Sequence, residues 1–327
     1  MKKRMPERII FHIDVNSAFL SWSAVDRLKK GETLDLRTVP SAVGGDVKQR
    51  RGVITARSIP AKSYGVLTGE PVVKAMEKCP GLIVIPGDYH LYNRCSRAFI
   101  EICRTYSPVL EQFSVDECFL DMTGCIENGG RAEAVNAANR LREEIFEKLS
   151  FTVNVGVAEN KLLAKTASDF RKPNLVHTLW PEELEDKFYP LPVRDLLFVG
   201  KAGAERLKTL GIRTIGDLHG TPLKVLAAHF GEKTGRMYAE SAAGRDDSPV
   251  RTERDDAKSY SHSTTLPYDL TTIEEVKPVL LNLSDRATYR MRRDGMKAMQ
   301  ITVSYRNPDF QTVSRQRMLG FSTDSSD

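Results

Sequence analysis

The sequence lacks the features that mark exported, membrane-spanning or zinc-binding proteins. Its five cysteines are odd in number and form no CxxC pair, which is typical of reduced thiols rather than a disulfide framework. Six scattered histidines give no zinc-site spacing. No stretch approaches the roughly 20 apolar residues that a membrane helix needs, and His12 and Asp14 follow the basic start too soon for an export signal. We therefore expect a cytoplasmic protein with no membrane partner.

A strong charge of one sign is also missing, since the net charge is only +5. This value permits a polyanionic partner but does not identify one. The chain of 327 residues is too long for one ordinary domain, and its hydrophobic fraction of 41% is enough for a sizeable core. We therefore expect a multidomain globular protein.

Hydrophobic periodicity predicts strands that alternate with helices over residues 1–180. The predicted strands lie at 9–15, within 37–58, at 82–85, within a hairpin at 110–122, and at 151–157. The predicted helices cover residues 17–29, 72–78, 91–107, 132–149 and 160–170. This alternation indicates an α+β fold in which helices cover a sheet.

The pattern changes beyond residue 180. Residues 181–243 predict short helices broken by glycines, and residues 244–257 are so poor in apolar side chains that they predict an exposed linker. Residues 258–327 predict a strand, a helix at 273–292 and two further strands at 299–305 and 312–319. The last unit ends without closing a fold, so we expect it to be truncated.

Three acidic residues interrupt apolar stretches. Asp14 lies at the end of a predicted strand, and Asp116 and Glu117 lie within the predicted hairpin. If the hairpin turns at 115–117, all three carboxylates can approach one point. Convergent carboxylates repel one another unless they hold divalent cations, and two Mg²⁺ ions suit an oxygen-rich site for phosphoryl transfer.

A plainer interpretation explains the same spacing. Asp14 would cap the following helix, and Asp116 and Glu117 would lie in a solvated turn. The spacing alone does not decide between a metal site and this alternative.

Four segments, in order, resemble the motifs of the Y-family (translesion) DNA polymerases. Residues 11–19 (FHIDVNSAF) and 114–121 (SVDECFLD) are similar to the two carboxylate motifs of that family. Residues 154–174, which end in Lys-Pro-Asn, and residues 53–66 are similar to its further conserved segments. The resemblance covers residues 8 to about 320.

The resemblance implies the catalytic and metal-binding residues. Metal-binding acids would be Asp14, Asp116 and Glu117, with the carbonyl of Val15 as a backbone ligand. The cofactor would be two Mg²⁺ ions per active site, for which Mn²⁺ can substitute.

The resemblance also implies the nucleotide-binding residues. Phe19 would exclude ribonucleotides by packing under the deoxyribose, although a phenylalanine on a helix is more often a core residue. Triphosphate contacts would come from Lys62 and Lys172, although Lys172 also suits a helix C-terminus. Ala56 would lie beside the nucleotide, and Val53, Thr55 and Gly69 would leave a roomy pocket for the templating base.

Three positions depart from many relatives in ways that bear on triphosphate binding. Lys62 replaces an arginine and so loses the bidentate fork, while Ser17 and Ile59 stand where some relatives have tyrosines.

The domains implied by the resemblance follow the predicted elements. They are a palm at 1–17 and 82–180, fingers at 18–81, a thumb at 181–243, a linker at 244–257 and an incomplete little finger at 258–327.

Two regions are candidates for DNA contacts. Residues 191–211 resemble a helix–hairpin–helix whose turn at 198–202, with Gly200 and Lys201, would bind a phosphate, and a second copy is predicted to begin at 229–231. Two helices packed through a glycine turn would look the same. In the little finger, the plausible contacts are Arg290, Arg292, Arg293 and Lys297, which could equally form a solvated face.

The expected function is template-directed extension of DNA primers, with low fidelity and no proofreading. The expected partners are primer–template DNA and a dNTP, with a sliding clamp bound through a C-terminal segment absent from this chain; the protein would be a monomer. One alternative is a catalytically inactive DNA-damage-binding accessory protein on the same scaffold. Another is a palm-domain nucleotidyl cyclase, suggested by Gly44-Gly45-Asp46.

Overall fold

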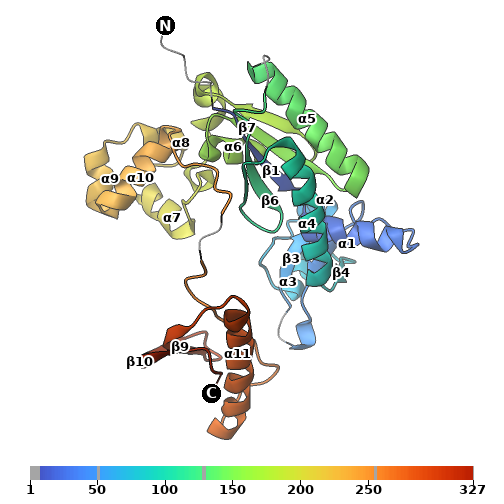
Figure 1. Cartoon of the computed structure of the whole chain (residues 1–327), viewed down its shortest axis with the longest axis vertical. Coiled ribbons are helices and arrows are strands. Elements are labelled where there is room, and N and C mark those ends of the chain that lie inside the picture. Colours follow the sequence, from blue (N-terminus) through green and yellow to red (C-terminus); the bar gives the residue numbers. More distant parts are fainter. Residues whose placement is uncertain (1–7, 50–51, 127–129, 254–255, 327) are drawn as a thin grey trace.

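The computed structural model describes residues 8–49, 52–126, 130–253 and 256–326 of the chain (Figure 1). The basic start at residues 1–7 lies outside these ranges. Helices and sheets are both present, as the α+β prediction required. Within the described ranges, no helix is long and apolar enough to cross a membrane.

The largest sheet has five strands, and its order is β5-β6-β1-β7-β8. These strands are β1 (Ile10–Val15), β5 (Leu110–Gln112), β6 (Glu117–Asp121), β7 (Val153–Ala158) and β8 (Val176–Leu179). The central strand, β1, runs antiparallel to both β6 and β7. It is therefore hydrogen-bonded along both edges, and the residues at its end are held from two sides.

The two faces of the large sheet have separate cores. Phe11 and Ile13 pack against α4 (Tyr89–Tyr106) and α5 (Gly130–Leu149), whereas Ile10 belongs to the core that includes α6 (Lys161–Ser168). Because alternate residues of a strand point to opposite faces, His12 and Asp14 lie on the α6 face. The only acid of β1 is thus placed under α6.

A smaller sheet of three strands, in the order β3-β2-β4, lies beside the large one. Its elements are β2 (Ser41–Gly44), β3 (Ile54–Arg57) and β4 (Ile83–Ile85), with helices α2 (Ile59–Ser63) and α3 (Val72–Lys78). Helix α1 (Ala18–Lys29) joins the two sheets, because Trp22 is buried in the core of the large sheet and Leu20 in that of the small one.

Four helices pack on the α6 face of the large sheet and share its core. They are α7 (Lys201–Thr209), α8 (Ile215–His219), α9 (Leu223–Phe230) and α10 (Glu232–Ala242). The predicted helix before the turn at 198–202 is wrong. Residues Val193–Asp195 form only a 3-10 turn, since Leu196 is already extended and Phe198 adopts a left-handed φ of 71°.

The second helix pair begins at Leu223, before the predicted start at 229–231, and its turn lies at Gly231. Helices α9 and α10 flank this glycine, whose φ of 81° is one that side-chain-bearing residues rarely adopt. The more regular helix–turn–helix of the cluster is therefore the one at 223–242, not the one at 191–211.

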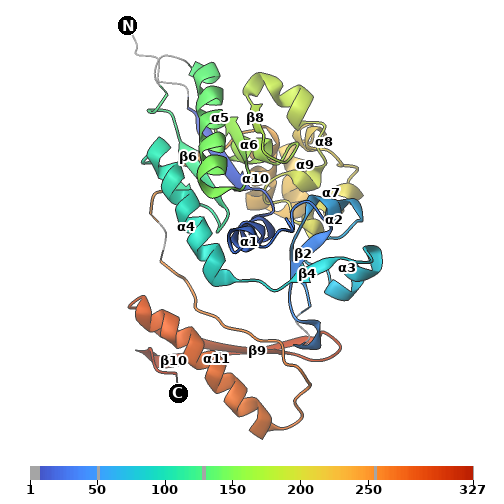
Figure 2. The same cartoon turned by 90° about the vertical axis from the view of Figure 1, so that its right-hand side faces the viewer.

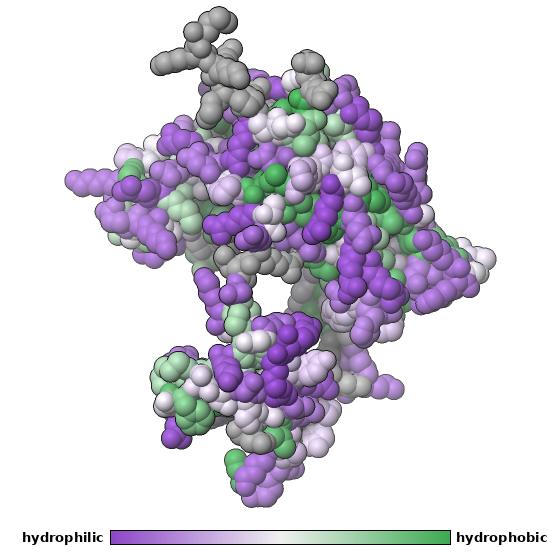
Figure 3. Space-filling model, viewed as in Figure 1, coloured by the Kyte–Doolittle hydropathy of each residue, from purple (hydrophilic) through white to green (hydrophobic). Residues whose placement is uncertain are grey.

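The C-terminal unit stands apart from the rest at the end of an extended segment (Figures 1 and 2). It consists of α11 (Ile273–Arg293), β9 (Ala298–Arg306) and β10 (Thr312–Thr323). The strand predicted before α11 is wrong, because residues 256–272 contain none and the sheet of this unit pairs only β9 with β10. Hydrophobic side chains, Met318 and Phe321 among them, are exposed on β10, and green patches mark this hairpin in Figure 3.

Helix α6 approaches the sheet most closely at Gly156 of β7. A Cβ atom at this position would lie 1.9 Å from the carbonyl oxygen of Ala164 and 2.5 Å from the backbone nitrogen of Ser168. Both atoms belong to the backbone of α6, so neither can move aside alone. Only glycine permits this distance between strand and helix.

We expect Gly156→Ala to lower the free energy of unfolding by about 3 kcal/mol or more, because α6 must move away from the sheet. Urea denaturation monitored by circular dichroism measures the change. Gly124→Ala is the matched control, since a Cβ there meets no atom within 4 Å. Equal stability of the two variants would contradict the close packing of α6.

Candidate active site

Asp14 and Glu117 lie directly opposite each other on the paired strands β1 and β6. Residues opposed in this way point to the same face of a sheet, here the one covered by α6. The Asp14 side chain is 19% exposed and that of Glu117 17% exposed. Removing two carboxylates from water is unfavourable unless each has a partner.

Asp14 is neutralised by Lys172 from the loop after α6. The Lys172 Nζ atom lies 2.7 Å from Asp14 Oδ1 and 2.9 Å from Asp169 Oδ1. Burial raises the pKa of Asp14 to about 6, even though Lys172 acts in the opposite direction. The suggestion that Asp14 caps α1 is wrong: Ser17 occupies the N-cap position, and the Asp14 carboxylate binds Lys172 instead.

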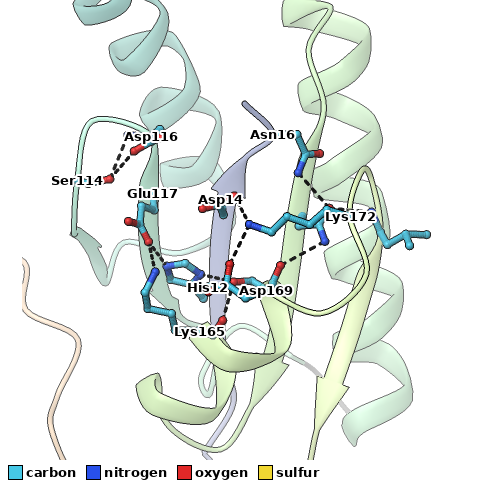
Figure 4. Close-up of polar contacts among 12 residues, drawn as sticks. His12, Asp14, Asn16, Ser114, Asp116, Glu117, Lys165, Asp169 and Lys172 are labelled. Atoms are coloured by element: carbon cyan, nitrogen blue, oxygen red, sulfur yellow. Dashed lines mark hydrogen bonds and ion pairs between the residues drawn. The ribbon is translucent and has the colours of Figure 1, made fainter. Parts of the chain in front are cut away.

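Glu117 is held by His12 and Lys165 (Figure 4). Burial lowers the pKa of His12 to about 4, so its imidazole is neutral near pH 7. Its Nε2–H donates to Glu117 Oε2 at 2.9 Å, because an ionised carboxylate only accepts. The Nδ1 atom then accepts from Ser168 Oγ at 2.7 Å. Burial opposes ionisation of Glu117, but the hydrogen bonds from His12 and Lys165 lower its pKa to about 2.

Asp116 lies in the loop before β6, next to the end of β1. Its carbonyl oxygen accepts from the backbone N–H of Val15 at 3.0 Å, and its carboxylate accepts from Ser114 Oγ at 2.6 Å. The three acids therefore come from adjacent backbone positions, but each carboxylate points to a different partner (Figure 4). In the described part of the chain, no three Asp, Glu, His or Cys side chains gather closely enough to hold a metal ion.

A cavity of about 380 Å³ opens beside Asp14, between the two sheets. The predicted site residues that line it are Asp14, Val15, Phe19, Thr55, Ala56, Lys62, Asp116 and Lys172. Glu117 is not among the lining residues, because its carboxylate turns toward His12. Val53 and Gly69 also lie outside the lining, whereas Thr68 belongs to it. The structure thus brings eight of the predicted residues to one hollow.

Phe19 packs in the core and also faces the cavity. Its ring stacks on Tyr92 with the ring centroids 4.4 Å apart and the planes 9° from parallel. It is only half-buried, however, and contacts the cores of both sheets. Its remaining surface lines the cavity five residues after Asp14.

Asn154, which the sequence interpretation passed over, holds the loop that carries Lys172. Its buried amide donates to the carbonyl oxygens of Ser168 at 3.2 Å and Arg171 at 3.0 Å. Its Oδ1 accepts from Asn16 Nδ2 at 3.2 Å. Lys172 is thereby fixed against the end of β1.

The sequence interpretation also missed His12 and Lys165, although the strand period and the helix period could have indicated them. His12 precedes Asp14 by two residues and so shares its face of the strand. Lys165 comes one helical turn before Asp169 in α6 and its following loop.

The predicted DNA-binding residues lie away from the cavity. Gly200 is the N-cap of α7, and Lys201 begins that helix with an exposed side chain. The three arginines of α11 contact their own unit: Arg290 the carbonyl oxygen of Ser261, Arg292 that of Asp324 and Arg293 the carboxylate of Asp294. Lys297 is exposed.

We expect Asp14→Asn to stabilise the protein at pH 8 in a chelating buffer. A carboxyl pKa raised from 3.8 to about 6 means that the folded state binds the proton more tightly, so stability falls as pH rises from about 4 to 6. The variant avoids this loss, which is about 3 kcal/mol at most. Urea denaturation of both proteins at pH 4 and pH 8 measures it. A less stable variant at pH 8 would contradict the burial cost assigned to Asp14.

Comparisons with known proteins identify families that match three parts of this chain. The family described as impB/mucB/samB matches residues 13–169, its C-terminal domain matches residues 257–327, and a DNA polymerase-iota thumb domain matches residues 194–246. A DNA polymerase IV of Clostridium acetobutylicum is 42% identical over 95% of this chain and 78% of the relative. DNA polymerase IV 1 of Bacillus subtilis is 35% identical over 95% of this chain and 73% of the relative.

Solved structures give the same result. A Y-family DNA polymerase chimera of Dbh and Dpo4 superposes with a TM-score of 0.83 at 26% identity, over 96% of this chain and 88% of that one. DinB from Sulfolobus solfataricus superposes with a TM-score of 0.65 at 25% identity, also over 96% and 88%. The resemblance inferred from the sequence motifs is confirmed, and the chain belongs to the Y-family DNA polymerases.

Proposed function

We propose that the chain extends a DNA primer in the cavity between its two sheets. Its relatives are named DNA polymerase IV, and the chain is accordingly a DNA-directed DNA polymerase of the translesion type. The observation that supports this site is the set of charged side chains that line one hollow. Asp14 and Asp116 line it together with Lys62 and Lys172, and Lys172 is paired with Asp14.

Y-family DNA polymerases generally use divalent metal ions. The donor set here fits such ions, because carboxylate and carbonyl oxygens are the ligands that Mg²⁺ prefers. We propose that Asp14, Asp116, Glu117 and the Val15 carbonyl hold two Mg²⁺ ions, with Mn²⁺ as a substitute. Bound there, the ions would stabilise the attacking and leaving oxygens of nucleotidyl transfer. The ammonium groups of Lys165 and Lys172 neutralise Glu117 and Asp14 in the present arrangement.

The side chains of the cavity divide the remaining tasks. Lys62 and Lys172 bind the triphosphate, and Lys172 exchanges Asp14 for a phosphate oxygen when the nucleotide enters. Phe19 packs under the deoxyribose and leaves no room for a 2′-hydroxyl. Ala56 and Thr55 are small, and they leave space beside the nascent base pair.

The structural units suggest how DNA is held. We propose that the five-stranded sheet is the palm, the three-stranded sheet the fingers, the helices α7 to α10 the thumb and the α11 unit the little finger. A ternary complex of the relative Dbh is known, and we propose primer–template DNA and a dNTP as the partners here. The helix N-terminus at Gly200 and Lys201 would contact a phosphate of the duplex.

Asp116→Ala tests the catalytic assignment. We expect primer extension with Mg²⁺ and dNTPs to fall at least 1,000-fold, roughly the loss of a major transition-state contact, with DNA affinity nearly unchanged. Single-turnover extension and fluorescence anisotropy measure the two quantities. Glu101→Ala, on the exposed face of α4, is the control. Retained extension by the Asp116 variant would refute the site.

Phe19→Ala tests the sugar selection. Removing the ring opens the space below the ribose, so we expect ribonucleotide incorporation to rise by about 10-fold or more relative to deoxynucleotides. Paired kcat/KM values for one dNTP and its rNTP measure this preference. Phe19→Tyr keeps the ring and serves as the control. If both variants discriminated as the unchanged protein does, Phe19 would be a packing residue alone.

A further inference from the structure

Arg57 is a third cation of the cavity that no motif assigned. It ends β3, two residues after Thr55, so the two side chains share one face of the strand. Both line the hollow, as does Lys62 from α2. Lys172 enters the same hollow from the large sheet, and it alone of these three cations has a carboxylate partner among the contacts of the described residues.

The Arg57 guanidinium has hydrogen-bonding capacity that the fold leaves unused. Its Nε atom is buried and has no hydrogen-bond partner within the described part of the chain. Among the residues that the structure describes, Glu70 is the acid whose charge acts on Arg57. That carboxylate is already engaged, since it accepts from Lys78 Nζ at 2.5 Å and from the backbone N–H of Leu67 at 2.6 Å. Arg57 is therefore not a structural ion-pair residue.

The positive charges of the three cations that line the cavity repel one another. Burial lowers the pKa of Lys62, and the positive charges of Arg57 and Lys172 lower it further. Burial also lowers the pKa of Arg57. Arg57 and Lys172 are half-buried and Lys62 is exposed, and an anion with several oxygens would relieve the repulsion among the three positive charges.

We propose that Arg57 donates its guanidinium N–H groups to the triphosphate of the incoming nucleotide. A guanidinium presents a planar fork that matches two phosphate oxygens, whereas a lysine ammonium acts as a point charge. Arg57 thereby supplies, from β3, the fork that is lost at position 62. The inference rests on the proposed function, since it assumes that the cavity takes a dNTP.

Steady-state incorporation of one dNTP tests Arg57 with a matched series. We expect Arg57→Ala to raise the KM for dNTP at least 10-fold, with kcat changed less than threefold, and Arg57→Lys to give an intermediate KM. The midpoint of thermal unfolding should not fall, since no structural ion pair is lost. Lys74→Ala, an exposed position on α3, is the control and should leave KM unchanged.

Inorganic tripolyphosphate separates this inference from the proposed function. We expect the Arg57→Ala variant to bind it at least 10-fold more weakly than the unchanged protein in calorimetric titration, whether or not the protein extends primers. A KM within twofold of the unchanged protein, or a variant that loses DNA affinity instead, would overturn the role of Arg57. Failure of the unchanged protein to extend any primer would overturn the proposed function. Equal tripolyphosphate affinities of the two proteins would overturn the role of Arg57 in either case.

Discussion

The burial of Asp14 and Glu117 on the α6 face of the five-stranded sheet is the constraint on which the site depends. Two carboxylates placed opposite each other repel, and the surrounding apolar core strengthens that repulsion. Ammonium groups from α6 and the loop that follows it neutralise the two carboxylates. Lys165, Lys172 and Asp169 all belong to that segment. The position of α6 therefore determines whether the acids can remain charged.

That position is in turn set by two contacts without charge. Gly156 lets the helix approach to a distance that a methyl group would prevent. The Asn154 amide then fixes the loop beyond the helix through two carbonyl oxygens. On the other side of the cavity, α1 fixes the small sheet through Trp22 and Leu20. The hollow is thus bounded by elements whose relative positions are set by packing.

Much of the fold could be predicted because its pattern is local. The helix predicted at 72–78 coincides with α3, and the strand predicted at 9–15 contains β1, since buried strands and amphipathic helices leave clear periods. The helix α2 has only five residues, and it depends on Ser58 Oγ accepting from the N–H of Ala61. The strand β8 is short and half-polar. Neither α2 nor β8 has enough residues for its period to be recognised in the sequence.

The site was predictable only in part, because it depends on contacts distant in sequence. The motifs identified Asp14, Asp116 and Lys172, which line one cavity. No spacing shows that Glu117 turns to His12, or that Arg57 Nε has no hydrogen-bond partner among the described residues. Val53 and Gly69 were placed at the cavity by resemblance, but neither residue lines it. Gly44-Gly45-Asp46, which suggested a cyclase, lies at the end of β2 in the small sheet, not beside the acids of the large one.

The shared core on the α6 face has a thermodynamic consequence. Leu162 and Leu163 of α6 contact the same apolar cluster as Leu207 of α7 and Leu226 of α9. These helices have no hydrophobic core of their own, so they and the five-stranded sheet should unfold as one cooperative unit. The α11 unit contributes only Met291 as a fully buried hydrophobic residue, and this residue belongs to none of the core clusters. Its folding equilibrium can therefore vary while the cavity between the two sheets stays ordered.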